Sequence, residues 1–284
     1  RYSKIYRLSP LSRVIAMTPA TAQRTILITG ASSGIGRELA RSYLAAGERV
    51  FALARSAESL AELVAAYPAS CIAVPVDLTS DTDCLRAAET IHSQTDYLDI
   101  AILNAGTCEY VDVYNLSMEP FDKVMAINWR GTLNSLQFCL PLLRKRQGSQ
   151  LVGVSSMASI LPMPRSQAYG ASKAALEYLF NSLRVDLVKE TIDISLVRPG
   201  FVKTPLTARN DFPMPFAVES DFAVKKIVQG IAKRKWIISF PWQLVWIMNF
   251  IAYLPLFLEL GKRELDLVCL YQSLFWRCTV GRFG

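Results

Sequence analysis

Tyr169 and Lys173 have the spacing that most directly indicates chemistry in this chain. They stand four positions apart, and residues i and i+4 share one face of a helix. An ammonium beside a phenol stabilises the phenolate, which predicts that the pKa of Tyr169 is lowered toward neutrality. A tyrosine tuned in this way can transfer a proton at pH 7. Ser156, thirteen residues before Tyr169, adds a hydroxyl that can donate a hydrogen bond to an oxygen gaining negative charge.

A glycine-rich turn lies near the start of the chain. Residues 29–36 read Thr-Gly-Ala-Ser-Ser-Gly-Ile-Gly, and they fall between an expected strand and an expected helix, which is the context that makes such a motif informative. Glycines let a pyrophosphate approach the backbone N–H groups at a helix N-terminus. The turn therefore predicts a nucleotide site, with contacts from Gly30, Ser32, Ser33, Gly34, Ile35 and Gly36.

Apolar runs of strand length alternate with amphipathic helical stretches along the chain. The expected strands are residues 25–29, 49–54, 71–76, 97–103, 150–155, 192–197 and 236–240. The longest expected helices are residues 119–145 and 168–189. This alternation predicts an α/β fold, in which right-handed crossovers give a Rossmann-type, doubly wound parallel sheet of about seven strands with helices on both faces.

Three segments follow from this pattern. We expect an N-terminal extension at residues 1–23, a Rossmann-fold dehydrogenase/reductase domain at 24–235 and a hydrophobic C-terminal segment at 236–284. The net charge of +7 is concentrated at the two ends. The C-terminal basic residues are interleaved with tryptophan and leucine and form no basic stripe, so no nucleic-acid partner is predicted, and a surface of anionic lipid suits the pattern better.

The cysteines and the histidine exclude several mechanisms. The six cysteines are scattered without a Cys-x-x-Cys pair, which predicts neither a disulfide framework nor a metal site. Free thiols are typical of a reducing compartment, so we expect a cytoplasmic protein, either free or peripheral on the inner face of a membrane. His92 is the single histidine, which excludes mechanisms that need a histidine pair, and we expect it to be a structural or solvated residue of a surface helix.

Several motifs occur together in one order. They are residues 29–36, Asn104-Ala105-Gly106, Asn128, Ser156, Tyr169, Lys173 and Pro199-Gly200. In this order and spacing, residues 24–230 resemble the short-chain dehydrogenases/reductases, in the compact branch with a Gly-x-x-x-Gly-x-Gly turn and a Tyr-x-x-x-Lys pair. The resemblance implies a nicotinamide cofactor and the interconversion of a carbonyl and an alcohol by hydride transfer.

The resemblance also implies roles for four catalytic residues. Tyr169 would act as the acid/base that protonates the carbonyl oxygen during reduction. Lys173 would lower the pKa of Tyr169 and hold the nicotinamide ribose hydroxyls. Ser156 would orient and polarise the carbonyl. Asn128, which is an unfavourable residue inside a helix unless it has a specific task, would hold a water for proton relay.

Further cofactor contacts are expected where strands end, because ligands of doubly wound sheets bind there. They are Asp77 and Leu78 at the adenine, Asn104, Ala105 and Gly106 after the fourth strand, Pro199 and Gly200 beside the nicotinamide, and Val202 and Thr204 near its carboxamide. Read from the residues alone, Asp77-Leu78 is equally a helix cap and Asn104-Gly106 an ordinary turn.

The end of the second strand decides between NAD and NADP. Ala54 occupies the position where an acid would bind the adenosine ribose hydroxyls of NAD. Arg55 follows it, and a guanidinium suits a 2′-phosphate. The sequence therefore favours NADP, and NAD is the less favoured cofactor. The alternative is that Arg55 is a solvated surface charge.

The C-terminal segment departs from the pattern of many soluble relatives, which end soon after the seventh strand and form tetramers. Residues 242–258 form a 17-residue apolar stretch that contains Gln243, Asn249 and Pro255, whereas a spanning helix needs about 20 apolar residues. Three interpretations stay open: a transmembrane helix, a segment lying in the membrane interface, or a core helix, lid or dimer contact. The segment resembles the tails of family members that act on lipids and steroids at membranes.

The expected substrate loop, residues 201–220, is apolar over residues 212–218, which favours a hydrophobic substrate. We therefore predict an NADP(H)-dependent oxidoreductase acting on a hydrophobic or lipid-like carbonyl or alcohol, and the resemblance implies a homodimer built on the two long helices. Two alternatives stay open. One is a nucleotide-binding regulatory protein without catalysis, and the other, within the enzyme class, is a 3-ketosphinganine-type or steroid reductase.

Overall fold

The structure is a computed structural model that describes the backbone of residues 23–258 and the side chains of residues 23–252. Residues 1–22 of the expected N-terminal extension and the chain beyond residue 258 lie outside the described residues.

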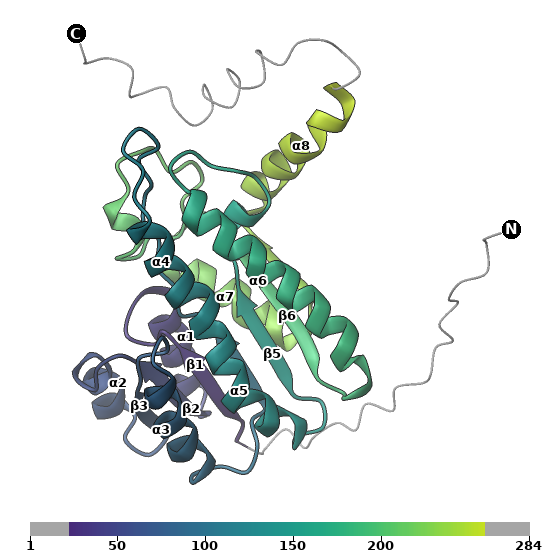
Figure 1. Cartoon of the computed structure of the whole chain (residues 1–284). Helices are drawn as coiled ribbons and strands as arrows, with labels where there is room; N and C mark the ends of the chain where they lie inside the picture. The colour runs from purple at the N-terminus through teal and green to yellow at the C-terminus, as the bar shows by residue number, and fades with distance from the viewer. Residues whose placement is uncertain (1–22, 259–284) are drawn as a thin grey trace, which may run out of the picture.

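The described chain folds around one parallel sheet (Figure 1). Its strands are β1 (Thr25–Thr29), β2 (Arg49–Ala54), β3 (Cys71–Pro75), β4 (Ile100–Leu103), β5 (Gln150–Val154), β6 (Asp193–Pro199) and β7 (Ile237–Phe240). Their order in the sheet is β3-β2-β1-β4-β5-β6-β7. The order reverses direction between β1 and β4, which is where a doubly wound sheet opens a crevice for ligands. The predicted Rossmann-type sheet is confirmed.

Helices cover both faces of this sheet (Figure 1). The α-helices of the described residues are α1 (Gly34–Ala45), α2 (Ala61–Ala66), α3 (Asp81–His92), α4 (Glu119–Met125), α5 (Gly131–Arg144), α6 (Gln167–Asp186), α7 (Ser220–Ala232) and α8 (Trp242–Leu258). Successive side chains of a strand point to opposite faces. Accordingly, Ile26 and Ile28 of β1 belong to the core under α1 and α7, and Leu27 belongs to the core under α3, α5 and α6.

The expected helix over residues 119–145 is one continuous helical segment with an irregular centre. A π-helical turn, Ala126–Arg130, joins α4 to α5. Such turns insert one extra residue into a helix and are frequent at functional sites. This turn carries Asn128, which is fully buried.

The fourth strand is shorter than the sequence predicts. It begins at Ile100 rather than at Tyr97, because the backbone N–H of Leu98 donates to the carbonyl of Leu142 at 3.2 Å instead of joining the sheet ladder. At the edge of the sheet, the last strand, β7, pairs with β6. The sheet therefore continues to Phe240, as the expected strand over residues 236–240 predicts.

α8 follows β7 at the carboxyl end of the sheet. Its buried residues Leu244, Met248 and Ile251 pack against Met157 and Leu161, and this side anchors the helix to the domain. Its opposite side is exposed. Among residues 23–258, no helix combines the length and the hydropathy that are needed to cross a bilayer.

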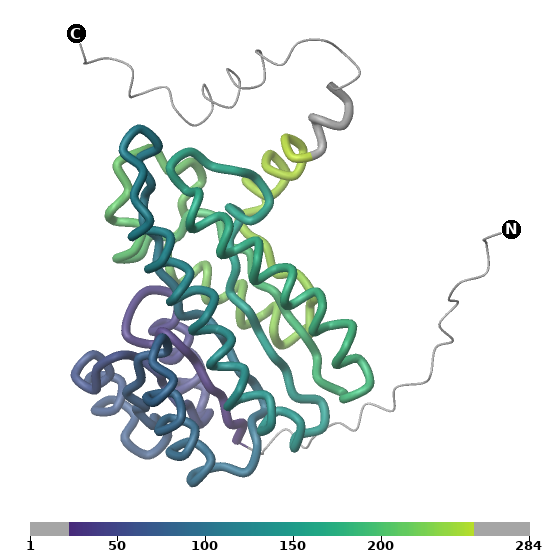
Figure 2. The backbone as a smooth tube through the Cα atoms, viewed as in Figure 1, coloured from purple at the N-terminus to yellow at the C-terminus, as the bar shows by residue number. Residues whose placement is uncertain are grey.

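The carboxyl ends of the central strands gather the loops that build the site. The segments that follow β4, β5 and β6 come together at one end of the domain, next to the start of α8 (Figure 2). The glycine turn leaves β1 at the same edge of the sheet, since all paired strands run parallel. Most residues singled out in the sequence lie on these loops or on the helices that follow them.

Candidate active site

Two glycines of the glycine turn, Gly30 and Gly36, leave no room for a side chain at their own positions. Gly30 has φ +68°, and a Cβ placed on Gly36 would lie 2.2 Å from the carbonyl oxygen of Gly30. Ser33 precedes α1 as its N-cap, but its hydroxyl makes no capping bond. The N-terminal N–H groups of α1 and the Ser33 hydroxyl are therefore available to an anion. This tight turn of backbone N–H groups and a hydroxyl fits the pyrophosphate of a dinucleotide.

Thr29 locks the glycine turn to the turn after β4. Its hydroxyl accepts hydrogen bonds from the backbone N–H groups of Asn104 at 2.9 Å and Ala105 at 3.0 Å. The amide of Asn104 donates to the carbonyl of Thr29 at 3.1 Å. A Cβ on Gly106 would lie 3.3 Å from Nζ of Lys173. The three residues of this motif thus bridge the glycine turn and Lys173.

The remaining expected cofactor contacts fall into two groups. Arg55 is exposed at the carboxyl end of β2, and Thr204 lies against the glycine turn, with its methyl group 3.3 Å from a Cβ built on Gly34. By contrast, the side chains of Leu78 and Val202 are buried in the hydrophobic core, so their backbones are the parts nearest to a ligand.

Asp77 and Gly200 lie at loop positions fixed by backbone contacts. The Asp77 carboxylate accepts from the N–H and the hydroxyl of Thr79, at 2.9 and 2.8 Å, whereas the N-cap of α3 is Ser80, so the helix-cap interpretation of Asp77 is wrong. Gly200 follows Pro199, the last residue of β6, and its N–H donates to the carbonyl of Phe240 at 2.8 Å. A Cβ on Gly200 would lie 2.5 Å from Leu244 of α8.

Tyr169, Lys173 and Ser156 converge as the spacing predicts. Tyr169 and Lys173 lie one turn apart on α6, with Nζ of Lys173 5.7 Å from the centre of the Tyr169 ring. Ser156 follows β5 and caps the 3₁₀ turn Met157–Ser159, its hydroxyl accepting from the N–H of Ala158 at 3.1 Å. Lys173 is 3% exposed and donates to the carbonyl of Val154 at 2.9 Å.

The expected lowering of the Tyr169 pKa is wrong for this structure. Burial raises the pKa of Tyr169 to about 12, and a hydrogen bond with Ser156 offsets only part of that rise. Burial also lowers the pKa of Lys173 to about 8. The expectation rested on the charge of the ammonium, whereas the cost of burying both groups is the larger effect on their pKa values. Tyr169 is therefore a protonated acid at neutral pH.

Asn128 braces two parts of the site. Its side-chain oxygen accepts from the N–H of Thr107 at 2.7 Å, and its amide donates to the Thr107 carbonyl and to the Ser172 hydroxyl, both at 2.9 Å. Both amide donors are thus engaged. These bonds tie the turn after β4 to α6 beside Tyr169. The water relay expected at Asn128 stays a prediction.

The buried Lys173 predicts a distinct pH dependence of stability. Its pKa is about 8 in the folded protein and 10.5 ordinarily, so between these values the unfolded chain holds a proton that the folded chain lacks. Stability conferred by this position therefore rises with pH across that window. We expect the parent to gain about 1–3 kcal/mol relative to Lys173→Met between pH 8 and pH 10, since one pKa unit corresponds to about 1.4 kcal/mol.

Urea unfolding of the two proteins without cofactor, at a series of pH values, measures this difference. The high pKa of Tyr169 acts in the opposite direction above pH 10, but Tyr169 is present in both proteins and cancels in the comparison. Parallel stability curves for parent and variant across pH 8–10 would contradict the assignment.

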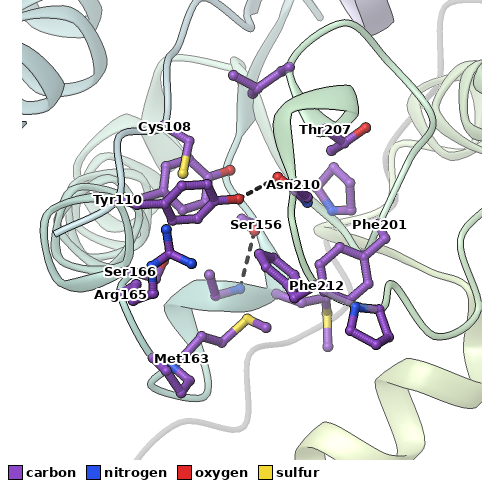
Figure 3. A pocket seen from close by; sticks show the side chains of 18 of the residues that line it. Cys108, Tyr110, Ser156, Met163, Arg165, Ser166, Phe201, Thr207, Asn210 and Phe212 are labelled. Carbon is purple, nitrogen blue, oxygen red and sulfur yellow. Dashed lines mark hydrogen bonds between the residues drawn. The ribbon is translucent and has the colours of Figure 1, made fainter. Parts of the chain in front are cut away.

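A cavity of about 210 Å³ opens beside Tyr169 and Ser156. Figure 3 shows Ser156 facing the same space as Tyr110, Phe201 and Phe212. Apolar side chains form much of the remaining wall, including Met157, Leu206, Leu244 and Met248. The hydroxyls of Tyr169 and Ser156 are therefore the polar end of a largely apolar chamber, which suits a ligand with one polar group on a hydrophobic body.

Sequence reasoning missed the polar residues of this cavity. Tyr110 donates to Asn210 (Figure 3), and burial raises the pKa of Tyr110 to about 12. Arg165 stacks 4.8 Å from the centre of the Tyr110 ring and pairs with Asp211 at 2.9 Å. Tyr110 and Asn210 are a hundred residues apart in the sequence. No local sequence pattern predicts contacts of this kind.

A second omission is the ion pair between Glu177 and Arg198. The carboxylate accepts from the guanidinium at 2.8 and 2.6 Å and also from the hydroxyls of Ser155 and Ser159. Glu177 thereby holds the ends of the Ser156 turn against α6. The available signal was its position four residues after Lys173 on the same helix face.

The chain matches one known protein family over more than half of its length. The profile of the family described as short chain dehydrogenase matches residues 24–213. The chain belongs to this family. Its members are oxidoreductases that bind NAD(P), and the cradle of the glycine turn beside Tyr169 and Lys173 fits that cofactor class.

Individual relatives support this membership. The chain is 38% identical over 224 residues to an uncharacterized oxidoreductase of Myxococcus xanthus, covering 78% of this chain and 88% of that protein. It is 36% identical over 211 residues to the rhamnolipids biosynthesis 3-oxoacyl-[acyl-carrier-protein] reductase of Pseudomonas aeruginosa, covering 71% and 81%. Among solved structures, the Pseudomonas aeruginosa RhlG/NADP active-site complex matches with a TM-score of 0.70 and 30% identity, over 78% of this chain and 95% of that chain.

Proposed function

We propose that this dehydrogenase interconverts a carbonyl and an alcohol on a hydrophobic, lipid-like substrate and uses NADP(H). One observation carries the proposal: the cavity has Tyr169 and Ser156 at one wall and apolar side chains over much of the rest. The Pseudomonas aeruginosa relative is named as a 3-oxoacyl-[acyl-carrier-protein] reductase, which also supports an acyl-like substrate.

In the direction of reduction, Tyr169 acts as the general acid. Its raised pKa keeps the phenol protonated at neutral pH, so it can donate a proton to the carbonyl oxygen. Ser156 donates a hydrogen bond to the same oxygen and stabilises its developing negative charge. The bound dinucleotide supplies the hydride for the carbonyl carbon.

Two further residues position these groups. Lys173, held by the carbonyl of Val154 and next to Gly106, would bind ribose hydroxyls and offset negative charge when Tyr169 loses its proton. Asn128 fixes the turn that carries Gly106 and Thr107. Asn104–Gly106, the glycine turn and the 199–204 loop would enclose the dinucleotide.

The substrate class is tested with carbonyl compounds graded by chain length. We expect kcat/KM to rise with chain length, because each methylene removed from water contributes about 0.8 kcal/mol and so about fourfold. Oxidation of NADPH at saturating cofactor measures it. Phe212→Ala, in the apolar wall, should weaken the dependence on chain length, whereas Leu85→Ala, on the exposed surface of α3, serves as the control. Equal or better turnover of short polar carbonyls would refute the lipid-like substrate.

Arg55 is the basis for proposing NADP over NAD. It is exposed at the end of β2, the strand next to the glycine turn, and a guanidinium can bind the 2′-phosphate. We expect Arg55→Ala to weaken NADPH binding by about tenfold or more, since a charge-assisted hydrogen bond contributes about 1.5–3 kcal/mol, and to leave NADH binding nearly unchanged.

Fluorescence titration with each cofactor measures both affinities. The control is Arg41→Ala. It removes an exposed arginine in the middle of α1, the helix that follows the glycine turn, and should change neither affinity. Equal losses for NADPH and NADH in the Arg55 variant would identify Arg55 as a structural charge and remove the argument for NADP.

We also propose that the protein forms a homodimer through α5 and α6. The outer side of α6 exposes Tyr178 and Val185, and Val188 follows in the next turn. Exposed apolar patches of this kind are typical of protein interfaces. Light scattering at micromolar concentration gives the mass directly, and a monomer at all concentrations would exclude this dimer.

A further inference from the structure

We propose that the outer face of α8 and the basic groove beside it dock this protein on the surface of a membrane that contains anionic lipids. The contact is peripheral, with the helix lying on the bilayer. The docking surface is defined as the exposed aromatic residues of α8 together with the phenylalanines and lysines of the neighbouring groove: Phe216, Phe222, Lys226, Lys233, Lys235, Trp242, Trp246 and Phe250.

The aromatic part of this surface is a stripe along α8. Trp242, Trp246 and Phe250 are spaced by four residues, so they share one side of the helix, and they are 70%, 73% and 64% exposed. α8 carries no charged residue. Large apolar side chains exposed in a continuous row indicate an interaction surface, and tryptophan is enriched where a protein meets the membrane–water interface.

The basic part is a groove of about 720 Å³ formed by α7, β7 and the start of α8. Lys226, Lys233 and Lys235 line it, and its lining contains no acidic residue. Within residues 23–258, these three lysines form no ion pair. Lys226 lies 5.3 Å from the centre of the exposed Phe222 ring. The groove thus combines uncompensated positive charge with aromatic surface.

This combination fits a bilayer better than a second copy of the chain. A two-fold interface places the same patch on both partners, so the lysines of one copy would face those of the other without an acid in the groove to neutralise them. An anionic lipid surface supplies the missing negative charge, and its interfacial region accepts the aromatic stripe.

Docking in this orientation would bring the substrate cavity close to the bilayer. The side of α8 opposite the stripe carries Leu244 and Met248, which line the cavity beside Tyr169. One helix therefore separates the cavity from the docking surface. This last step rests on the proposed function, because only a lipid-like substrate gains from entry at a membrane; the docking itself does not depend on catalysis.

The experiment is flotation of the full-length protein with vesicles of phosphatidylcholine alone and with vesicles that also contain phosphatidylserine. We expect binding to the anionic vesicles and little binding to the neutral ones. Lys233→Ala should weaken binding about fivefold, the effect of one basic residue near an anionic surface, and this difference should shrink at high salt. Trp242→Ala and Trp246→Ala should each weaken binding at all salt concentrations.

Two matched controls lie on other faces: Leu85→Ala on α3 for the aromatic substitutions, and Lys189→Ala after α6 for the lysine. Both should bind as the parent does. Binding that is equal for all variants would overturn the proposal, as would self-association in solution that Trp246→Ala abolishes, which would identify a second copy as the occupant. Flotation measures no turnover, and failure of docking is therefore distinguishable from failure of the proposed reaction.

Discussion

Replacement of Tyr169 by phenylalanine is expected to lower kcat by about 10²- to 10⁴-fold, the range that a positioned general acid contributes. The change removes one oxygen atom and keeps the ring, which lies next to Lys173. Cofactor affinity should therefore stay within a few-fold of the parent. The rate of NADPH oxidation with a long-chain ketone gives kcat, and fluorescence titration gives the cofactor Kd.

Tyr110→Phe is the matched control for this experiment. Tyr110 lines the same cavity, and its burial also raises its pKa to about 12. Its hydroxyl donates a hydrogen bond to Asn210 and not to Ser156. Loss of its hydroxyl should reduce kcat by less than about tenfold, as expected for one hydrogen bond. If Tyr110→Phe were inactive and Tyr169→Phe active, the role of general acid would belong to Tyr110.

Gly36→Ala is expected to abolish cofactor binding. The added methyl group would lie 2.2 Å from the carbonyl oxygen of Gly30 and 2.4 Å from the amide of Asn104. Both belong to the connected turns that form the phosphate cradle, so relief of the clash must distort the site itself. We expect no saturation with NADPH at millimolar concentration and a loss of about 1–3 kcal/mol in the free energy of unfolding, as for other overpacked sites.

Gly47→Ala separates the two effects. Gly47 has φ +82° but no neighbouring atom within 4 Å of the new methyl group, so this variant has backbone strain without a clash. It should lose about 1 kcal/mol of stability and bind cofactor as the parent does. Normal cofactor binding by Gly36→Ala would show that the cradle can widen and would contradict the role given to this glycine.

The fold could be predicted from the sequence because its signals are local. The apolar strand runs and the glycine turn each occupy a few consecutive residues, and their order determines a doubly wound sheet. Tyr169, Lys173 and Ser156 were likewise singled out from their spacing, since Tyr169 and Lys173 lie on one helix and Ser156 follows the strand before it.

The electrostatics of the site could not be predicted in the same way. The pKa values of Tyr169 and Lys173 depend on how deeply both are buried, and burial is set by elements far away in the sequence. The same limit applies to Glu177 and Arg198, or to Tyr110 and Asn210, whose contacts cross between separate elements. For α8 the sequence left three interpretations open, because hydropathy does not say which side of a helix meets the domain.

The π-helical turn Ala126–Arg130 has a consequence for insertions and deletions. Removal of one residue from this turn would restore a regular helix and improve its local hydrogen bonding. Because the wide turn absorbs its extra residue locally, α4 and α5 would keep nearly the same faces on the sheet, and the change would fall on the turn itself. Asn128 lies in this turn and would leave Thr107 and Ser172. A length change that makes the helix more regular and spares the fold would therefore dismantle the site.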